Sequence, residues 1–182
     1  MVPAALLAAA LGGTAGYMVL QDEPVVPIGG PFTLLDGTGK TVTDRDFRGR
    51  VMLVYFGYTH CPDACPTALA DMVAAADMLG DRAHGLAMVF ITVDPERDTP
   101  AIMKDYVTPF GAPIAALSGA PDAVADAMRA YRVYAARNPT ADGYDMDHSS
   151  IIYVMDRTGR FVTNFTHETP PQQMADRLRP LL

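Results

Sequence analysis

Two runs made almost entirely of apolar residues dominate the hydropathy pattern. They cover Val51 to Phe56 and Leu86 to Val93, and neither shows the polar alternation of a strand with one wet face. Such runs are typical of strands buried on both faces of a sheet. A helical pattern follows each run: apolar positions recur three and four apart from Pro66 to Leu79, and Thr99-Pro100 pairs an N-cap residue with Pro at the first helical position. The centre of the chain therefore has a βαβα order.

Shorter elements are expected on both sides of this centre. Residues Phe32 to Val42 alternate around the turn Asp36-Gly37-Thr38-Gly39, which predicts a hairpin. Asp44 to Phe47 is expected to form a single helical turn. A short apolar stretch from Ile114 to Leu117 precedes an amphipathic helix that begins at Pro121.

The last third of the pattern predicts antiparallel strands. Tyr134 to Asp147 contains the turn signals Asn138-Pro139 and Asp142-Gly143, so we expect an exposed hairpin or loop there. Ser149 to Met155 and Arg160 to Phe165 then form a terminal hairpin.

A final helix capped by Thr169 closes the chain. The whole order predicts an α/β, thioredoxin-like fold, in which a mixed central sheet carries helices on both faces. An N-terminal β-hairpin precedes this core, and the exposed hairpin or loop is inserted before the penultimate strand.

Length and charge narrow the possible functions. A chain of 182 residues that is 49% hydrophobic has room for one domain. Its formal net charge of -7, with both signs mixed along the sequence, excludes the basic surface of a nucleic-acid binder.

The N-terminal segment is read separately from the domain. Residues 3–20 carry no charged side chain, so residues 1–22 are expected to form a membrane anchor or a signal segment; a buried N-terminal helix is the alternative. No Lys or Arg precedes the apolar run, which indicates either a truncated start or a misassigned start codon. Residues 23–31 are rich in Pro and Gly and suit an extended tether, which leaves residues 32–182 as the domain.

The chemistry is expected at Cys61 and Cys65, the two cysteines of the sequence. They are too few for a disulfide scaffold or a four-cysteine zinc site. Because they lie between a strand and a helix, both thiols should be near a helix N-terminus, where partial positive charge favours the thiolate. A closed zinc site would need two more ligands, whereas Cu(I) accepts two or three soft or imidazole donors.

A third donor is expected among the four histidines. His60, His84 and His167 occupy loop positions that usually have a structural or surface role. His148 differs because it ends the inserted loop immediately before a buried strand, at the junction that faces the cysteine loop in a thioredoxin-like fold. Asp147 and Asp145 are expected to accept a hydrogen bond from its other ring nitrogen.

Two further features near this site have no ligand role of their own. Met146 is better explained as a gap-filling side chain than as a thioether ligand. The segment from Asp94 to Thr99 lacks metal-ligand spacing and is expected to be a structured loop and helix cap near the site.

Over essentially the whole domain, from about Phe32 onward, the chain resembles the Sco/SenC family of copper-binding assembly proteins. The resemblance rests on separated blocks in the same order: Tyr55-Phe56-Gly57-Tyr58-Thr59-His60-Cys61-Pro62-Asp63-Ala64-Cys65-Pro66, Thr92-Val93-Asp94-Pro95-Glu96-Arg97-Asp98-Thr99-Pro100, Asp147-His148-Ser149 and Asp156-Arg157-Thr158-Gly159. It implies a thioredoxin-like fold and metal ligation by Cys61, Cys65 and His148, with Asp147 and Asp63 beside the ligands.

The resemblance also implies a biological setting. Members bind copper, as Cu(I) and Cu(II), and help to build the dinuclear copper centre of cytochrome c oxidase, so the implied partner is the subunit that bears that centre. Other periplasmic copper chaperones or thiol-disulfide proteins are further implied partners. The expected location is the inner membrane, with the domain facing the periplasm or the equivalent mitochondrial intermembrane space.

Three functions remain open at this point. The first is a copper metallochaperone that delivers the metal or reduces the cysteines of the copper centre. The second is a thiol-disulfide oxidoreductase or thiol peroxidase in which Cys61 and Cys65 are the redox-active pair. The third, a copper-responsive sensor, has no support in the sequence beyond the shared ligands.

Overall fold

The computed structural model describes residues 27–166 and 168–182 of the chain. The anchor or signal segment expected over residues 1–22, residues 23–26 of the tether and His167 lie outside the described residues. The strands are β1 (Thr33–Asp36), β2 (Thr41–Thr43), β3 (Val51–Gly57), β4 (Leu86–Thr92), β5 (Ile114–Ser118), β6 (Ala135–Thr140), β7 (Gly143–His148), β8 (Ile151–Met155) and β9 (Phe161–Thr166). The α-helices are α1 (Ala64–Leu79), α2 (Pro100–Val107), α3 (Pro121–Tyr131) and α4 (Pro171–Leu178).

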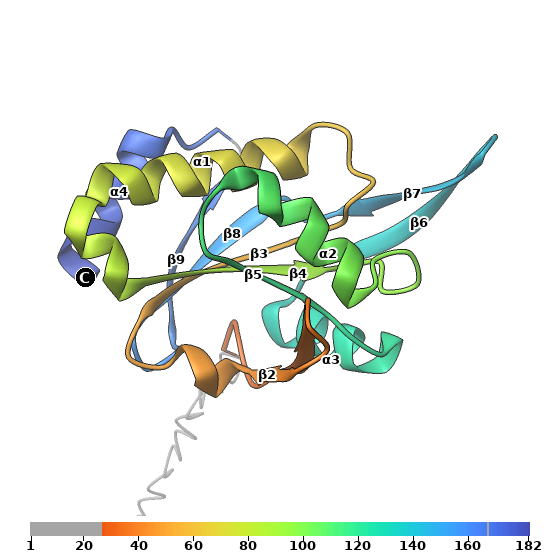
Figure 1. Ribbon diagram of the computed structural model, residues 1–182, viewed down its shortest axis with the longest axis horizontal. Helices are drawn as coiled ribbons and strands as arrows, with labels where there is room; N and C mark the ends of the chain where they lie inside the picture. Colours follow the sequence, from red (N-terminus) through yellow and green to blue (C-terminus); the bar gives the residue numbers. More distant parts are fainter. Residues whose placement is uncertain (1–26, 167) are drawn as a thin grey trace, which may run out of the picture.

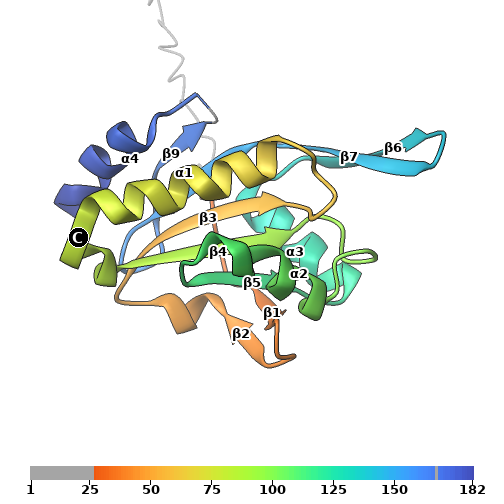
Figure 2. The ribbon, with the colours of Figure 1, turned by 45° about the horizontal axis from the view of Figure 1, so that its top comes forward.

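A mixed sheet forms the centre of the molecule (Figure 1). Within the described residues, seven strands join in the order β2-β1-β5-β4-β3-β8-β9, with β3, β4 and β5 parallel and the other pairs antiparallel. Helices α1 and α4 pack together on one face and α3 lies on the opposite face (Figures 1 and 2). The predicted thioredoxin-like α/β arrangement is therefore confirmed.

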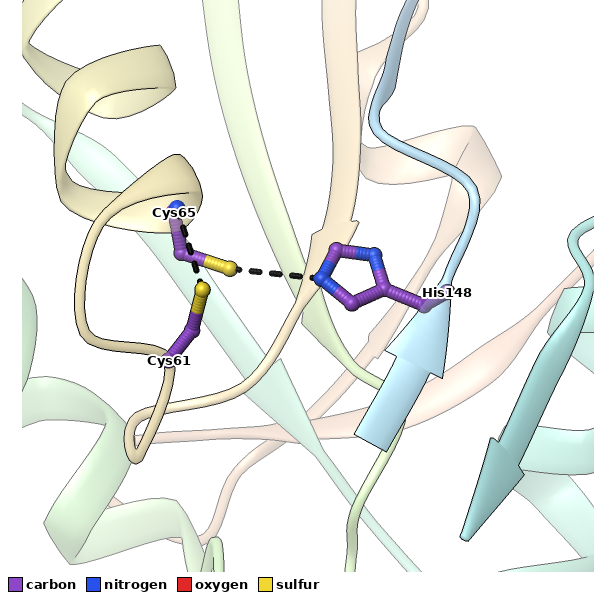
Figure 3. Close-up of side chains that lie close together, drawn as sticks. All are labelled: Cys61, Cys65 and His148. Carbon is purple, nitrogen blue, oxygen red and sulfur yellow. Dashed lines mark hydrogen bonds between the residues drawn. The ribbon is translucent and has the colours of Figure 1, made fainter. Parts of the chain in front are cut away.

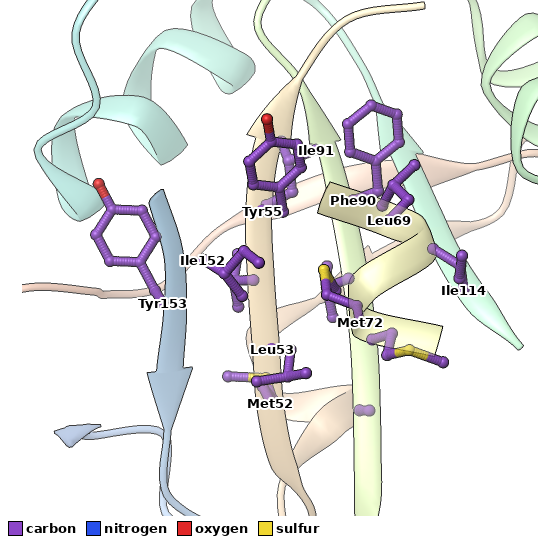
Figure 4. Packing of buried hydrophobic residues seen from close by; sticks show 14 of the residues in the cluster. Met52, Leu53, Tyr55, Leu69, Met72, Phe90, Ile91, Ile114, Ile152 and Tyr153 are labelled. Carbon is purple, nitrogen blue, oxygen red and sulfur yellow. The ribbon is translucent and has the colours of Figure 1, made fainter. Parts of the chain in front are cut away.

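The apolar runs at the centre are explained by burial on both sides. Every residue of β3 and β4 is buried. On one face, Leu53 and Tyr55 belong to the same apolar cluster as Leu69 and Met72 of α1 (Figure 4). On the other face, the ring of Phe56 packs against the rings of Tyr131 and Tyr153.

Helix α1 begins earlier than its apolar pattern indicates. The helix starts at Ala64 rather than Pro66, so Pro66 lies in the first turn, where its missing N–H has no helical partner to lose. Cys65 consequently lies inside the first turn, and Cys61 lies just ahead of the helix.

The β1–β2 and β8–β9 hairpins are closed by turns with the same hydrogen-bond pattern. The carboxylate of Asp36 accepts hydrogen bonds from the main chain and hydroxyl of Thr38, and the carboxylate of Asp156 does the same with Thr158. Both turns lie where the sequence predicts them.

The inserted segment is a hairpin of β6 and β7. In the described part of the chain it forms a sheet of its own, and it projects away from the main sheet (Figures 1 and 2). Its reversal falls between Thr140 and Gly143. The turn predicted at Asn138-Pro139 is wrong: Pro139 pairs with Tyr144 inside β6, where an edge strand tolerates the missing N–H.

The predicted cap of the last helix is also wrong. Pro170 is the N-cap residue of α4, and the Thr169 hydroxyl instead accepts a hydrogen bond from the Thr166 N–H at 3.1 Å. Among residues 27–166 and 168–182 there is no helix with the length and apolar character needed to span a bilayer.

Candidate metal centre

The cysteine loop connects the end of β3 to the start of α1. Cys61 is half-buried and Cys65 is fully buried. The Cys65 main-chain N–H, one of the helical donors without an intrahelical partner, points at Cys61 Sγ at 3.4 Å (Figure 3). The helix N-terminus thus presents its partial positive charge to the half-buried sulfur of Cys61.

His148 reaches the cysteines from the last position of β7. Its Nε2 lies 3.6 Å from Cys65 Sγ (Figure 3). Its Nδ1 lies 3.2 Å from the main-chain carbonyl oxygen of Ser149. A carbonyl can only accept, so Nδ1 carries the proton and the lone pair of Nε2 faces the sulfur.

The hydrogen-bond acceptor expected for His148 was assigned to the wrong residues. The Ser149 carbonyl takes the place predicted for Asp147 or Asp145. Successive side chains of a strand alternate between faces, and both carboxylates are exposed while His148 is half-buried. Asp147 acts on the ring only through its charge, which favours the protonated imidazole.

Asp63 lies between the two cysteines in the sequence, but its side chain does not cap helix α1. It is the N-cap residue of α1, its side chain is exposed, and its carboxylate makes no capping hydrogen bond.

Three donor atoms converge closely enough to bind one metal ion. The ligand atoms of Cys61, Cys65 and His148 all lie within 4.8 Å of one another. Donor–metal bonds of about 2.0–2.3 Å place two donors of one ion roughly 3.3–3.9 Å apart. The 3.6 Å between Cys65 and His148 falls in that range, so the residues fit a metal ion.

Burial sets the protonation of the donors. Burial raises the pKa of the Cys65 thiol to about 12, so this sulfur keeps its proton until a metal displaces it. Burial lowers the pKa of His148, so the imidazole is neutral and able to coordinate at neutral pH. Two sulfurs and one neutral imidazole are a donor set that suits copper.

The segment after β4 forms hydrogen bonds both to the loop that carries the cysteines and to the hairpin that carries His148. The buried carboxylate of Asp98 accepts from the Thr59 N–H and hydroxyl, which fixes the loop that leads to Cys61. The buried carboxylate of Asp94 accepts from the Tyr144 hydroxyl at 2.9 Å, which fixes the hairpin that carries His148.

Arg97 strengthens this link. Its Nε donates to Asp94, its Nη1 donates to the Tyr144 carbonyl at 2.9 Å, and its guanidinium carbon lies 3.8 Å from the centre of the Tyr144 ring. The sequence predicted a structured loop here but not its link to both ligand-bearing segments. The sequence feature that could have indicated this link is the pair of acidic residues, Asp94 and Asp98, that follows the buried strand β4.

The other candidate donors among the described residues lie outside the site. The imidazole of His60 contacts the Thr59 hydroxyl at 3.2 Å and is half-exposed, and His84 lies exposed in a turn after α1. Met146 packs against the apolar core. These placements agree with the roles expected from the sequence.

Fold and site together define a class: a thioredoxin-like protein with two cysteines four positions apart and a distant histidine that form a metal-binding cluster. The chain matches the SCO1/SenC family over residues 21–182. It is 41% identical to Protein SenC of Rhodobacter capsulatus over 150 residues, which cover 82% of this chain and 68% of that protein. The chain belongs to the SCO1/SenC family.

Solved structures agree with this assignment. The structure of Bradyrhizobium japonicum ScoI with copper bound is 48% identical, with a TM-score of 0.80 over 85% of this chain and 99% of that chain. Arabidopsis thaliana ScoI with copper bound is 36% identical, also with a TM-score of 0.80, over 84% of this chain and 96% of that chain.

Proposed function

We propose that this chain is a copper metallochaperone that binds one copper ion through Cys61, Cys65 and His148. The observation that carries the proposal is the convergence of the three donor atoms within 4.8 Å. The solved structures of ScoI from Bradyrhizobium japonicum and from Arabidopsis thaliana with copper bound support copper as the metal. Copper is the cargo, and its destination is the dinuclear centre of cytochrome c oxidase.

Ligand exchange explains how such a site releases its metal. Cu(I) is stable with two or three soft donors, so an incoming thiolate can add before an outgoing one leaves. Cys61 is half-buried whereas Cys65 is inaccessible, so an incoming ligand reaches the metal on the Cys61 side. The imidazole, with an added oxygen donor, also suits Cu(II).

The proposal includes a membrane-tethered arrangement. Residues 1–22 form the anchor or signal segment, residues 23–31 form the tether, and residues 32–182 form the copper-binding domain. Its support is the uncharged apolar run of residues 3–20. The domain then faces the periplasm, or the intermembrane space of mitochondria, where it meets the oxidase subunit that bears the copper centre or another periplasmic copper chaperone or thiol-disulfide protein.

Thiol-disulfide exchange is the second candidate, because the two sulfurs lie within 4.8 Å of each other. The Cys61 thiolate attacks a substrate disulfide, which forms a mixed disulfide and releases one substrate thiolate. Cys65 then loses its proton and attacks Cys61 Sγ, which forms the Cys61–Cys65 disulfide and releases the second substrate thiolate. Two electrons pass to the substrate, as reduction of the copper-centre cysteines would require. A thiol peroxidase would use the same pair, with peroxide as the electron acceptor.

An anaerobic Cu(I) titration against a competing chelator tests the site. We expect one Cu(I) per wild-type chain and a loss of about 100-fold or more in affinity in Cys61→Ala, Cys65→Ala and His148→Ala, equivalent to about 2.8 kcal/mol. His84→Ala, an exposed histidine in a turn, is the matched control and should bind as the wild type does.

An unchanged affinity in His148→Ala would contradict the three-donor site. Catalytic reduction of a model disulfide by the metal-free protein, far faster than by a free thiol, would instead favour the oxidoreductase.

A further inference from the structure

The hydroxyl group of Tyr55 contacts the buried sulfur of Cys65. Tyr55 of β3 is 1% exposed, and its hydroxyl donates a hydrogen bond to Cys65 Sγ at 3.7 Å. Its ring is stacked on Phe90, with centroids 6.0 Å apart, and meets the imidazole of His148 edge-on at 6.3 Å. The phenol is therefore held in place by rings on two sides and touches two of the three metal-binding side chains.

Strand β3 leaves room for the Cys65 sulfur next to the Tyr55 hydroxyl. Gly57 lies two residues after Tyr55 and faces the same side of the sheet. A Cβ added at Gly57 would lie 2.6 Å from Cys65 Sγ and 2.9 Å from Phe90 Cε2. The Cys65 sulfur thus occupies the space that a side chain at position 57 would fill.

The same hydroxyl reaches toward the strand that follows His148. Burial raises the pKa of the Tyr55 hydroxyl, and the side chain of Ser150 acts on the same group in the opposite direction. Ser150 is two residues beyond His148. Tyr55 consequently lies between the Cys65 sulfur on α1 and the His148 imidazole at the end of β7.

We infer that Tyr55 is a positioning residue of the copper site, whose hydroxyl sets the orientation and the electron donation of the Cys65 sulfur. This inference rests on the proposed copper-binding function. A hydrogen bond to a coordinated thiolate withdraws electron density from the sulfur, and such bonds tune the redox potential of copper–thiolate sites. Tyr55 therefore favours bound Cu(I) over Cu(II).

Tyr55→Phe removes the hydroxyl and keeps the ring contacts. We expect its Cu(I) affinity to fall about tenfold, equivalent to about 1.4 kcal/mol. In the Cu(II) form, the sulfur-to-copper charge-transfer band should move to longer wavelength and the Cu(II)/Cu(I) reduction potential should fall, because the sulfur becomes a stronger donor. A merely structural role would leave the band and the potential unchanged.

Tyr153→Phe is the matched control. Tyr153 is also buried in a strand of the main sheet, but its ring packs against Phe56 and Tyr131 on the face away from the cysteines. This variant should keep the wild-type affinity, band position and potential. Equal changes in both variants would overturn the inference.

The wild-type titration separates this inference from the proposed function. Failure of the wild type to bind Cu(I) overturns the proposed function. Wild-type binding together with an unchanged affinity and spectrum in Tyr55→Phe overturns the role of Tyr55 alone. The hydroxyl proton of Tyr55, followed by NMR in the folded wild-type protein, gives a readout that needs no variant: it should shift when Cu(I) is added, and an unmoved resonance contradicts the inference.

Discussion

The buried carboxylate of Asp98 receives both the main-chain N–H and the hydroxyl of Thr59, at 3.0 and 2.6 Å. The Thr92 hydroxyl adds a third hydrogen bond at 2.7 Å. These bonds join the segment after β4 to the loop before Cys61. The position of the Cys61 sulfur therefore depends on a carboxylate that is not one of the proposed metal ligands.

Asp98→Ala should be strongly destabilising, because it leaves three buried or partly buried donors without their acceptor. We expect the free energy of unfolding to fall by about 2–4 kcal/mol, measured by chemical denaturation. The control is Asp105→Ala, the same substitution at an exposed position of α2, which should change the value by less than about 0.5 kcal/mol. Similar losses in the two variants would show that the Asp98 bonds do not stabilise the fold.

Tyr144→Phe should loosen the hairpin that carries His148. The variant loses the hydrogen bond to Asp94 but keeps the aromatic face against Arg97. Amide hydrogen exchange measured by mass spectrometry should become about 5- to 10-fold faster in β6 and β7 and stay unchanged in β3 and β4. Tyr134→Phe is the control, since Tyr134 is 59% exposed; unchanged exchange in Tyr144→Phe would contradict the docking role of Asp94.

Gly57→Ala should disturb the site and the fold together. The added methyl group meets Cys65 Sγ and the Phe90 ring, and overpacking of this kind costs about 1–3 kcal/mol of unfolding free energy. The displaced sulfur should also bind Cu(I) more weakly.

Gly85→Ala is the control for that change. The nearest atom to its added methyl group is the flexible end of Leu182 at 3.3 Å, at the far end of β4 from the site. Wild-type copper affinity in Gly57→Ala would mean that Cys65 does not depend on this space.

The β8–β9 turn should contribute a pH-dependent part of the stability. Hydrogen bonds from Thr158 and Arg160 lower the pKa of Asp156 from 3.8 to about 2. Because the folded-state pKa is the lower one, the stabilisation is present above about pH 4 and is lost as the pH falls toward 2. The group is near the surface, so we expect about 1 kcal/mol.

Denaturation of Asp156→Asn from pH 7 to pH 2 measures this contribution. The difference from the wild type should shrink across the window from pH 4 to pH 2. A difference between wild type and Asp156→Asn that stays constant with pH would contradict the assigned cause.

Local sequence signals predicted the local elements well. The apolar runs located β3 and β4 because strands buried on both faces tolerate few polar residues, and Thr99 caps α2 as expected, with its side chain accepting from the Ile102 N–H. The turn expected at Asn138-Pro139 was wrong because a free strand edge accommodates Pro139.

The sequence singled out three donor residues, whose ligand atoms the structure places within 4.8 Å of one another, but it did not indicate the contacts that hold them there. Cys61, Cys65 and His148 stand out by residue type and position, whereas their supporting contacts join residues far apart in the chain. Asp98 meets Thr59 across 39 positions, and Tyr144 meets Asp94 across 50. Spacing along the sequence carries no information about such pairs, and the assignment of Asp147 failed because the alternation of the strand turns it away from the ring.

Because β6 and β7 form a separate hairpin, the measured affinity for the metal depends on the fraction of molecules in which this hairpin is docked against the main sheet. In the described part of the chain these strands pair with each other and not with the main sheet, and side chains such as Asp94 and Arg97 hold them beside it. Only molecules with the hairpin docked present all three donors, so the apparent Kd for the metal equals the intrinsic Kd divided by the docked fraction. A molecule that binds the undocked hairpin therefore lowers the affinity for the metal without contacting any of its ligands.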